Sequence, residues 1–221
     1  MSMRFLNQSH CWPFWVILVL LQQIVIMKKI LLVAATAFMS TMLFAQTKWT
    51  VDPVHSNVKF TVTHLVISEV EGSFKKFDGS LASTKPDFSD AAINFNVDVS
   101  SVNTDNDMRD NHLKSDDFFN APQYPNMSFK STSIKKVSDN KYELYGNLTI
   151  RDVTKPVKFD VTYGGTTKDG YGNTKAGFKA TTTINRFDYN LKWNGLTSAG
   201  DATVGKDVTI DLRLEFAQAK A

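Results

Sequence analysis

The sequence predicts an all-β fold: an antiparallel sandwich or barrel of about eight strands with one short helix. The first observation is alternation, since Val58, Phe60 and Val62 face one way while polar residues between them face the other. The second is recurrence, because this half-buried pattern returns along the chain between turn residues. Eight strands closed into a barrel leave no free edge, and the interior is either filled by side chains or holds one small ligand. Periodicity does not choose between those two interiors.

The strands follow from the same alternation, taken in chain order. The opening strand has Trp49 and Val51 on one face and ends at Asp52-Pro53, because proline cannot donate a ladder hydrogen bond. After this short strand at residues 48–52, the eight longer predicted strands span residues 56–65, 70–82, 91–99, 127–134, 142–150, 157–163, 176–184 and 208–216.

Two features interrupt the early strands. Residues 66–70 are predicted to form a crossover between the second and third strands. In the third, Phe74 and Phe77 are three residues apart, which breaks strict alternation and predicts a bulge at Gly72 or at residues 75–76.

Residues 103–119 leave the strand pattern and predict the one short helix. Asp105 or Asn106 would cap its first turn. Arg109 and Leu113 are four residues apart, as are Met108 and His112, so each pair would share a helical face. Another break, over residues 189–205, is rich in Gly, Asn and Ser, which predicts a loop; we expect its Trp193 to anchor that loop on the barrel.

The net charge of +3 comes from the first 45 residues. They contain Arg4, Lys28 and Lys29 and no acidic residue, so removing them leaves 22 basic against 22 acidic residues. We therefore expect no nucleic-acid partner. The only cysteine, Cys11, also lies there, so the rest of the chain has neither a disulfide framework nor thiol chemistry.

Residues 27–45 have the anatomy of a secretory signal peptide. Lys28-Lys29 is a short basic region, residues 30–44 form an apolar run, and Ala45 precedes the predicted cleavage point. Residues 1–26 do not fit this pattern, and we interpret them as an over-extended start that is not part of the fold. The alternative is a membrane anchor built from both apolar runs, but Lys28-Lys29 would then lie in hydrocarbon at high cost. Residues 46–221 form the predicted exported domain.

Few residues indicate chemistry. His55, His64 and His112 lack metal-ligand spacing, and no glycine-rich phosphate loop or nucleophile motif is present. We therefore predict no metal site, cofactor or catalytic residue. Asp52 beside His55 is explained by an Asx turn before proline. His64, on an apolar face, is either a core histidine bonded to its neighbours or a ligand contact.

Five ordered blocks of the sequence cover about residues 48–216: Trp49–Phe60 with His64, Gly72–Gly79, Asp107–Phe119 with Tyr124-Pro125, Gly146–Val157, and Val204–Val208. Together they resemble the YceI-like, polyisoprenoid-binding periplasmic proteins. A looser block lies at Arg186-Phe-Asp188-Tyr-Asn, and Asp152 stands where the family usually has glycine.

The resemblance implies a lipocalin-like, eight-stranded antiparallel barrel in the periplasm with a long amphiphile inside it. Family members are described with different lipids, so isoprenoid, quinone and fatty-acyl ligands all stay open, as does a homodimer. His64, Arg109 and His112 lie in matching motifs and are candidate contacts for a head group at the mouth. We expect the small residues Gly146, Ala176 and Ala180 to leave room inside. The predicted lipid-binding residues are Phe60, Val62, His64, Phe95, Arg109, His112, Leu148 and Phe159.

Three functions remain open at this point. The first is a non-enzymatic carrier that buries a lipid chain, at about 0.8 kcal/mol per methylene. The second is an enzyme acting on an apolar substrate with His64 or His112 as acid–base. The third is a structural or stress-response barrel filled by its own side chains.

Overall fold

The computed structural model describes residues 22–23, 26–28 and 46–220. It divides at Ala45 into two units, of which residues 46–221 form the barrel unit. The predicted start site, signal peptide and cleavage point fall on residues 1–45, almost wholly outside the described residues. No helix among the described residues is long and apolar enough to cross a membrane.

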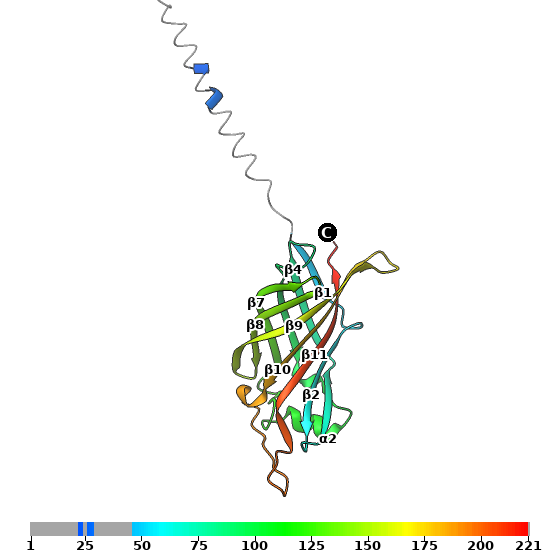
Figure 1. Cartoon of the computed structure of the whole chain (residues 1–221), viewed down its shortest axis with the longest axis vertical. Helices are drawn as coiled ribbons and strands as arrows, with labels where there is room; N and C mark the ends of the chain where they lie inside the picture. Colours follow the sequence, from blue (N-terminus) through cyan, green and yellow to red (C-terminus); the bar gives the residue numbers. More distant parts are fainter. Residues whose placement is uncertain (1–21, 24–25, 29–45, 221) are drawn as a thin grey trace, which may run out of the picture. The chain divides into compact units, whose positions relative to one another are not determined.

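A closed ring of eight antiparallel strands forms the barrel (Figure 1). Its closure comes from β1, which pairs with β4 on one side and with the end of β11 on the other. The all-β prediction with one short helix is therefore confirmed, and the sheet is a barrel rather than a sandwich. The ring consists of β1 (Thr47–Val51), β4 (Phe77–Ser83), β5 (Ala92–Asp98), β7 (Asn126–Ser138), β8 (Lys141–Ile150), β9 (Val153–Lys168), β10 (Thr174–Asn185) and β11 (Val204–Gln218).

Three further strands lengthen this barrel at one end. The first part of β11 pairs with β2 (Asn57–His64), β2 pairs with β3 (Ser68–Phe74), and β3 pairs with β6 (Val102–Asn103). Each is joined to a ring strand by a short break in the chain. β2 follows β1, β3 precedes β4, and β6 follows β5 through the 3-10 helix η1 (Val99–Ser101). The barrel is thus taller than the ring strands alone.

Two predicted connections differ from the structure. Residues 65–67 form the turn of an antiparallel hairpin between β2 and β3, so the predicted crossover at 66–70 is wrong. The long strand predicted at 70–82 is two strands separated by Lys75-Lys76, one of the two positions where a bulge was expected. Lys75 and Lys76 instead donate backbone N–H groups to Ser101, which follows β5.

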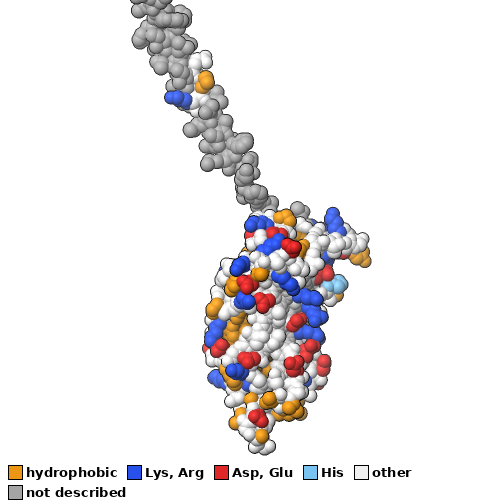
Figure 2. Space-filling view, viewed as in Figure 1, with side chains coloured by type: hydrophobic (Ala, Val, Ile, Leu, Met, Phe, Trp, Pro, Cys, Tyr) orange, Lys and Arg blue, Asp and Glu red, His pale blue; other side chains and the backbone are white. Residues whose placement is uncertain are grey.

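The helix α2 (Asp107–Lys114) lies at the end of the barrel that β2 and β3 lengthen (Figure 1). Asn106 is its N-cap, as expected from the sequence, and its side-chain oxygen accepts a hydrogen bond from the Arg109 N–H at 3.0 Å. On the face drawn in Figure 2, basic and acidic side chains are interspersed over the barrel, in agreement with its balanced charge.

Candidate functional site

The barrel encloses a cavity of about 360 Å³. Its wall is almost entirely apolar and comes from every ring strand except β1, together with β2, β3 and α2. All eight residues predicted to bind lipid line this one cavity. Its volume lies in the range typical of small-molecule sites, about 300–1,000 Å³. The interior is therefore not filled by its own side chains.

Phe88 closes the end of the cavity away from α2. It lies in the loop between β4 and β5, has a positive φ of 58°, and is only 3% exposed. Its ring centroid is 5.4 Å from those of Trp49 and Tyr163 and 5.2 Å from that of Phe178. The Tyr142 hydroxyl donates to the backbone carbonyl of Asp87 at 2.6 Å, which holds the loop inward. Sequence periodicity gave no sign of this cluster, because Phe88 lies outside any strand.

The opposite end of the cavity lies beside α2, and because an exposed side chain joins the lining there, we infer that this is its open end. Lining residues here, such as Val62, His64 and Thr203, are half-buried, and Arg109 is exposed. They come from segments far apart in the sequence: β2, α2 and the loop that precedes β11. Figure 1 shows these three segments at the same end of the barrel. An amphiphile could therefore place its chain inside and its head group here.

Three phenylalanine rings lie against glycines of neighbouring strands. A β-carbon at Gly72 would be 2.3 Å from the Phe60 ring, and one at Gly79 would be 2.4 Å from the Phe95 ring. Gly146 is likewise covered, since its β-carbon would be 2.3 Å from the Phe129 ring. We expected Gly146 to leave room in the lumen; instead it lets an aromatic ring lie close to the wall. Of the two small residues on β10, Ala180 lines the cavity and Ala176 does not.

Arg109 and His112 sit on α2 at the open end, held by different partners. The Arg109 guanidinium donates to the Thr104 hydroxyl and carbonyl, both at 2.7 Å, and Thr104 in turn donates to buried Asp110 at 2.6 Å. His112 pairs with Asp117 at 2.9 Å.

Aromatic groups surround His112 at this end. Its ring lies edge-on to Phe118 at 5.1 Å and to Trp193 at 5.7 Å, and these two rings stack on each other. Trp193 is anchored as predicted, because its ring stacks on Phe118 and its backbone N–H donates to the carbonyl of Asp117 at 3.0 Å.

Arg186, which the sequence analysis did not select as a site residue, also lines the cavity. It begins the 3-10 helix η2 (Arg186–Tyr189) and is only 3% exposed. Its guanidinium donates to four backbone carbonyls, and burial lowers its pKa. The acceptors are the carbonyls of Leu191, Trp193, Val204 and Gly205, at 2.6 to 3.2 Å. Its place in the loose Arg186–Asn190 block was the only sequence signal for it.

A second arginine, Arg151, holds the loops at this end without lining the cavity. It lies in the turn between β8 and β9 with a φ of 54°. Its guanidinium donates to the carbonyls of Asp116, Phe118 and Asn190 at 2.8 to 2.9 Å and pairs with the Asp116 carboxylate at 2.7 Å. Asp152 accepts a hydrogen bond from the Asn190 side chain, so the residue that departs from the family pattern also serves this turn.

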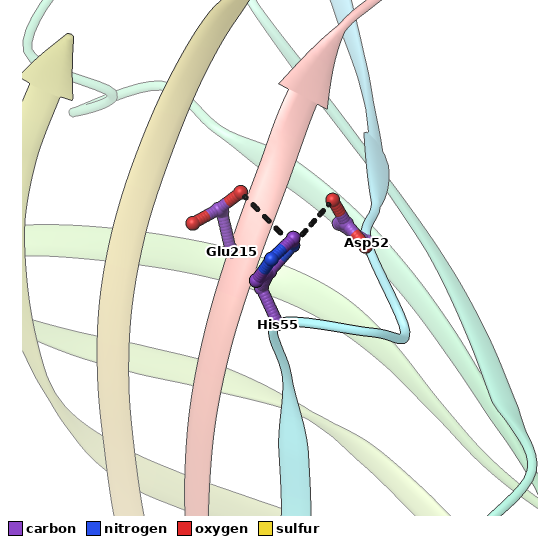
Figure 3. Close-up of side chains that lie close together, drawn as sticks. All are labelled: Asp52, His55 and Glu215. Atoms are coloured by element: carbon purple, nitrogen blue, oxygen red, sulfur yellow. Dashed lines mark hydrogen bonds and ion pairs between the residues drawn. The ribbon is translucent and has the colours of Figure 1, made fainter. Parts of the chain in front are cut away.

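Asp52, His55 and Glu215 form a cluster away from the cavity (Figure 3). Their ligand atoms lie within 4.8 Å of one another, a spacing that suits a metal ion. However, the Lys175 ammonium already lies 2.7 Å from the Asp52 carboxylate and 3.1 Å from that of Glu215. Asp52 also accepts from the Val54 N–H at 3.1 Å, the predicted Asx turn. This cluster fixes the break between β1 and β2 onto β10 and β11.

Comparison with known proteins agrees with this architecture. The YceI-like domain model matches residues 49–216. A UPF0312 protein of Staphylococcus aureus (strain bovine RF122 / ET3-1) is 38% identical over 171 residues, covering 77% of this chain and 97% of the relative. The crystal structure of BcnA from Burkholderia cenocepacia has a TM-score of 0.64 at 25% identity, over 75% of this chain and 98% of that one.

A third similar protein shares the fold at low identity. The polyisoprenoid binding domain from Saccharophagus degradans, implicated in plant cell wall breakdown, has a TM-score of 0.59 at 14% identity, over 77% of this chain and 98% of that one. At that identity the likeness shows the fold alone. The family model and the S. aureus relative carry the assignment: the chain belongs to the YceI-like family.

Proposed function

We propose that this protein binds a long-chain amphiphile inside the barrel and carries it through the periplasm without chemical turnover. The observation that carries the proposal is the apolar cavity of about 360 Å³ inside the barrel, which Phe88 closes at one end. Isoprenoid, quinone and fatty-acyl chains all fit this chemistry. Membership of the YceI-like family supports the same reading.

The binding energy would come from burying the chain. Each methylene moved from water into the cavity contributes about 0.8 kcal/mol, so ten methylenes supply about 8 kcal/mol before the costs of association. Phe60, Val62, Phe95, Leu148 and Phe159 would contact the chain. His64, Arg109 and His112, at or near the open end, would contact the head group.

A cavity-filling variant tests this proposal. Ala180 faces the lumen from β10, whereas its neighbour Thr181 is exposed on the outer face. We expect Ala180→Phe to weaken binding of a fluorescent polyene fatty acid at least about tenfold, while Thr181→Phe binds as the wild type does. Thermal unfolding checks that both variants fold. No binding by the wild type, or equal binding by both variants, would contradict the proposal.

The enzymatic alternative has less support in the geometry. His64 accepts hydrogen bonds at its backbone carbonyl, from Ser68 and Ile67, and within residues 46–220 no carboxylate is hydrogen-bonded to its ring to orient it as a general base. His112 does have Asp117, but its ring packs against Phe118 and Trp193. Turnover of a bound lipid that His64→Ala abolishes, with the fold intact, would favour this alternative.

A further inference from the structure

Among the described residues, the cavity wall includes basic side chains but no carboxylate. Lys59, His64, Arg109, His112 and Arg186 contribute to the wall, and within residues 46–220 no aspartate or glutamate does. The barrel as a whole carries balanced charge, so this segregation is particular to the cavity. It favours a ligand that brings negative charge.

Two of these basic groups already have partners outside the lumen. The Lys59 ammonium lies 2.6 Å from the Glu71 carboxylate, and the His112 ring lies 2.9 Å from that of Asp117. Each of these groups therefore already has a carboxylate partner, which weakens any attraction that it could offer to an acidic ligand.

Arg109 and Arg186 differ from Lys59 and His112, because neither guanidinium has a carboxylate within 4.0 Å among the described residues. Arg186 is 97% buried, and its four hydrogen bonds all go to neutral carbonyls, which leaves one of its five N–H groups unassigned. Arg109 bonds only Thr104, while the nearby Asp110 carboxylate is occupied by the N–H and hydroxyl of the same threonine. A buried cation without a counter-charge, as at Arg186, is unfavourable, and an anion beside it recovers part of that cost. Arg109 is exposed, so an anion could reach it from the opening.

Both arginines belong to the open end. The Arg186 guanidinium donates to the carbonyl of Val204 at 3.2 Å, and Val204 pairs across the sheet with His64, the last residue of β2. Arg109 lies on α2, beside the same opening. A head group placed there would lie near both guanidinium groups while its chain fills the lumen.

From this charge pattern we propose that the ligand has an acidic head group, a carboxylate or a phosphate, that lies at the α2 end against Arg186 and Arg109. The inference rests on the proposed function, since it assigns the head group of the same ligand. A charge-assisted hydrogen bond is worth about 1.5–3 kcal/mol, which corresponds to roughly 10- to 150-fold in affinity.

Ligands with matched chains test it on the wild-type protein. Geranylgeranyl phosphate is compared with geranylgeraniol, and palmitate with 1-hexadecanol, each by displacement of the fluorescent fatty acid. We expect each acid to bind at least about tenfold more tightly than its alcohol; preference in the phosphate pair alone identifies a phosphate head. If the alcohols bind as tightly as the acids, the acidic head group is wrong but the lipid cavity stands. If no compound binds, the proposed function fails as well.

A pair of variants then locates the effect. Arg109→Gln removes the exposed cation at the opening and should reduce the preference for acid over alcohol by about tenfold. Arg213→Gln is the control, because Arg213 is an exposed arginine on β11 that pairs with Asp211. An unchanged preference in Arg109→Gln, or an equal loss in both variants, would overturn the assignment of Arg109. Arg186→Lys, which keeps the charge, should retain the preference if the variant folds.

Discussion

The ring of Phe60 lies directly over Gly72, its partner across the β2–β3 pair. Gly79 with Phe95 repeats this arrangement on β4 and β5. On β8 and β7 the Phe129 ring also lies over Gly146, although the cross-strand partner of Gly146 is Ser131. In each pair the glycine has no side chain to push the ring away from the wall. Three large aromatic groups can thus face the interior of the barrel while a cavity remains between them.

Substitution of Gly72 tests whether these glycines keep the lumen open. A β-carbon there would lie 2.3 Å from the Phe60 ring and 2.8 Å from the Thr104 methyl group, so the ring must move toward the lumen. We expect Gly72→Ala to lower the free energy of unfolding by about 1–3 kcal/mol and to weaken lipid binding. Chemical denaturation and ligand titration measure the two effects.

The control for Gly72 is Gly177 on β10, where an added β-carbon would meet nothing within 4 Å. Gly177→Ala should keep the wild-type affinity for lipid. If Gly72→Ala binds lipid as well as this control, the glycines do not set the size of the cavity.

Truncation of Phe88 should destabilise the closed end of the barrel. The ring is buried among Trp49, Tyr163 and Phe178, so Phe88→Ala removes several aromatic contacts at once. We expect a loss of about 3–5 kcal/mol in the free energy of unfolding. Tyr171→Ala, at a side chain that is 92% exposed, should cost less than about 0.5 kcal/mol. Similar values for the two variants would contradict the role of Phe88 as a plug.

The Asp52 cluster should make stability fall in acid. The Lys175 ammonium, followed by the His55 ring, holds the pKa of Asp52 well below its usual range. Because the pKa is lower in the folded state, ionised Asp52 stabilises the fold at neutral pH. That contribution is complete above the unfolded pKa of about 3.9 and is lost as pH falls through the folded pKa.

Removal of the ammonium tests this pH dependence. Lys175→Gln should lose about 1–2 kcal/mol at pH 7 and show a shallower decline in unfolding free energy below pH 4. Lys179→Gln, four residues along β10 and without an ion pair among the described residues, is the matched control. A decline below pH 4 that is as steep in Lys175→Gln as in the control would rule out the proposed role of this pair.

Loss of the helix cap should loosen the open end. The Asn106 side chain accepts the Arg109 N–H in the first turn of α2. We expect Asn106→Ala to cost about 1 kcal/mol and to speed hydrogen exchange in α2. Asn106→Asp, which keeps the acceptor, should restore the exchange rate; no recovery would show that the cap does not hold this helix.

Local patterns in the sequence were enough to predict the strands, the cap of α2 and the residues on the inner face. Alternation at Val58, Phe60 and Val62 depends only on the two-residue period of a strand, so it can be seen without the fold. The break at Lys75-Lys76 could be suspected from the spacing of the flanking phenylalanines. Even so, the hairpin at residues 65–67 was misread, because an apolar turn lacks the usual Gly and Asn signals.

The features that the sequence did not predict depend on contacts between segments that are far apart in the chain. Phe88 lies in a loop, and only the closed barrel brings it against Trp49 and Phe178. From the sequence alone, Arg186 would be taken for a surface residue. In the fold, the loop of residues 190–205 covers it, and backbone carbonyls of that loop accept hydrogen bonds from its guanidinium. Likewise, the absence of acidic residues from the lining appears only when all the strands are closed around one cavity.

Native mass spectrometry of the protein, purified without detergent from its native host, tests the central claim most directly. We predict a species heavier than the polypeptide by the mass of one amphiphilic lipid, which organic extraction removes and added lipid restores. A single species at the bare polypeptide mass, with no uptake of any offered isoprenoid, quinone or fatty acid, would contradict the claim that the barrel is a lipid carrier.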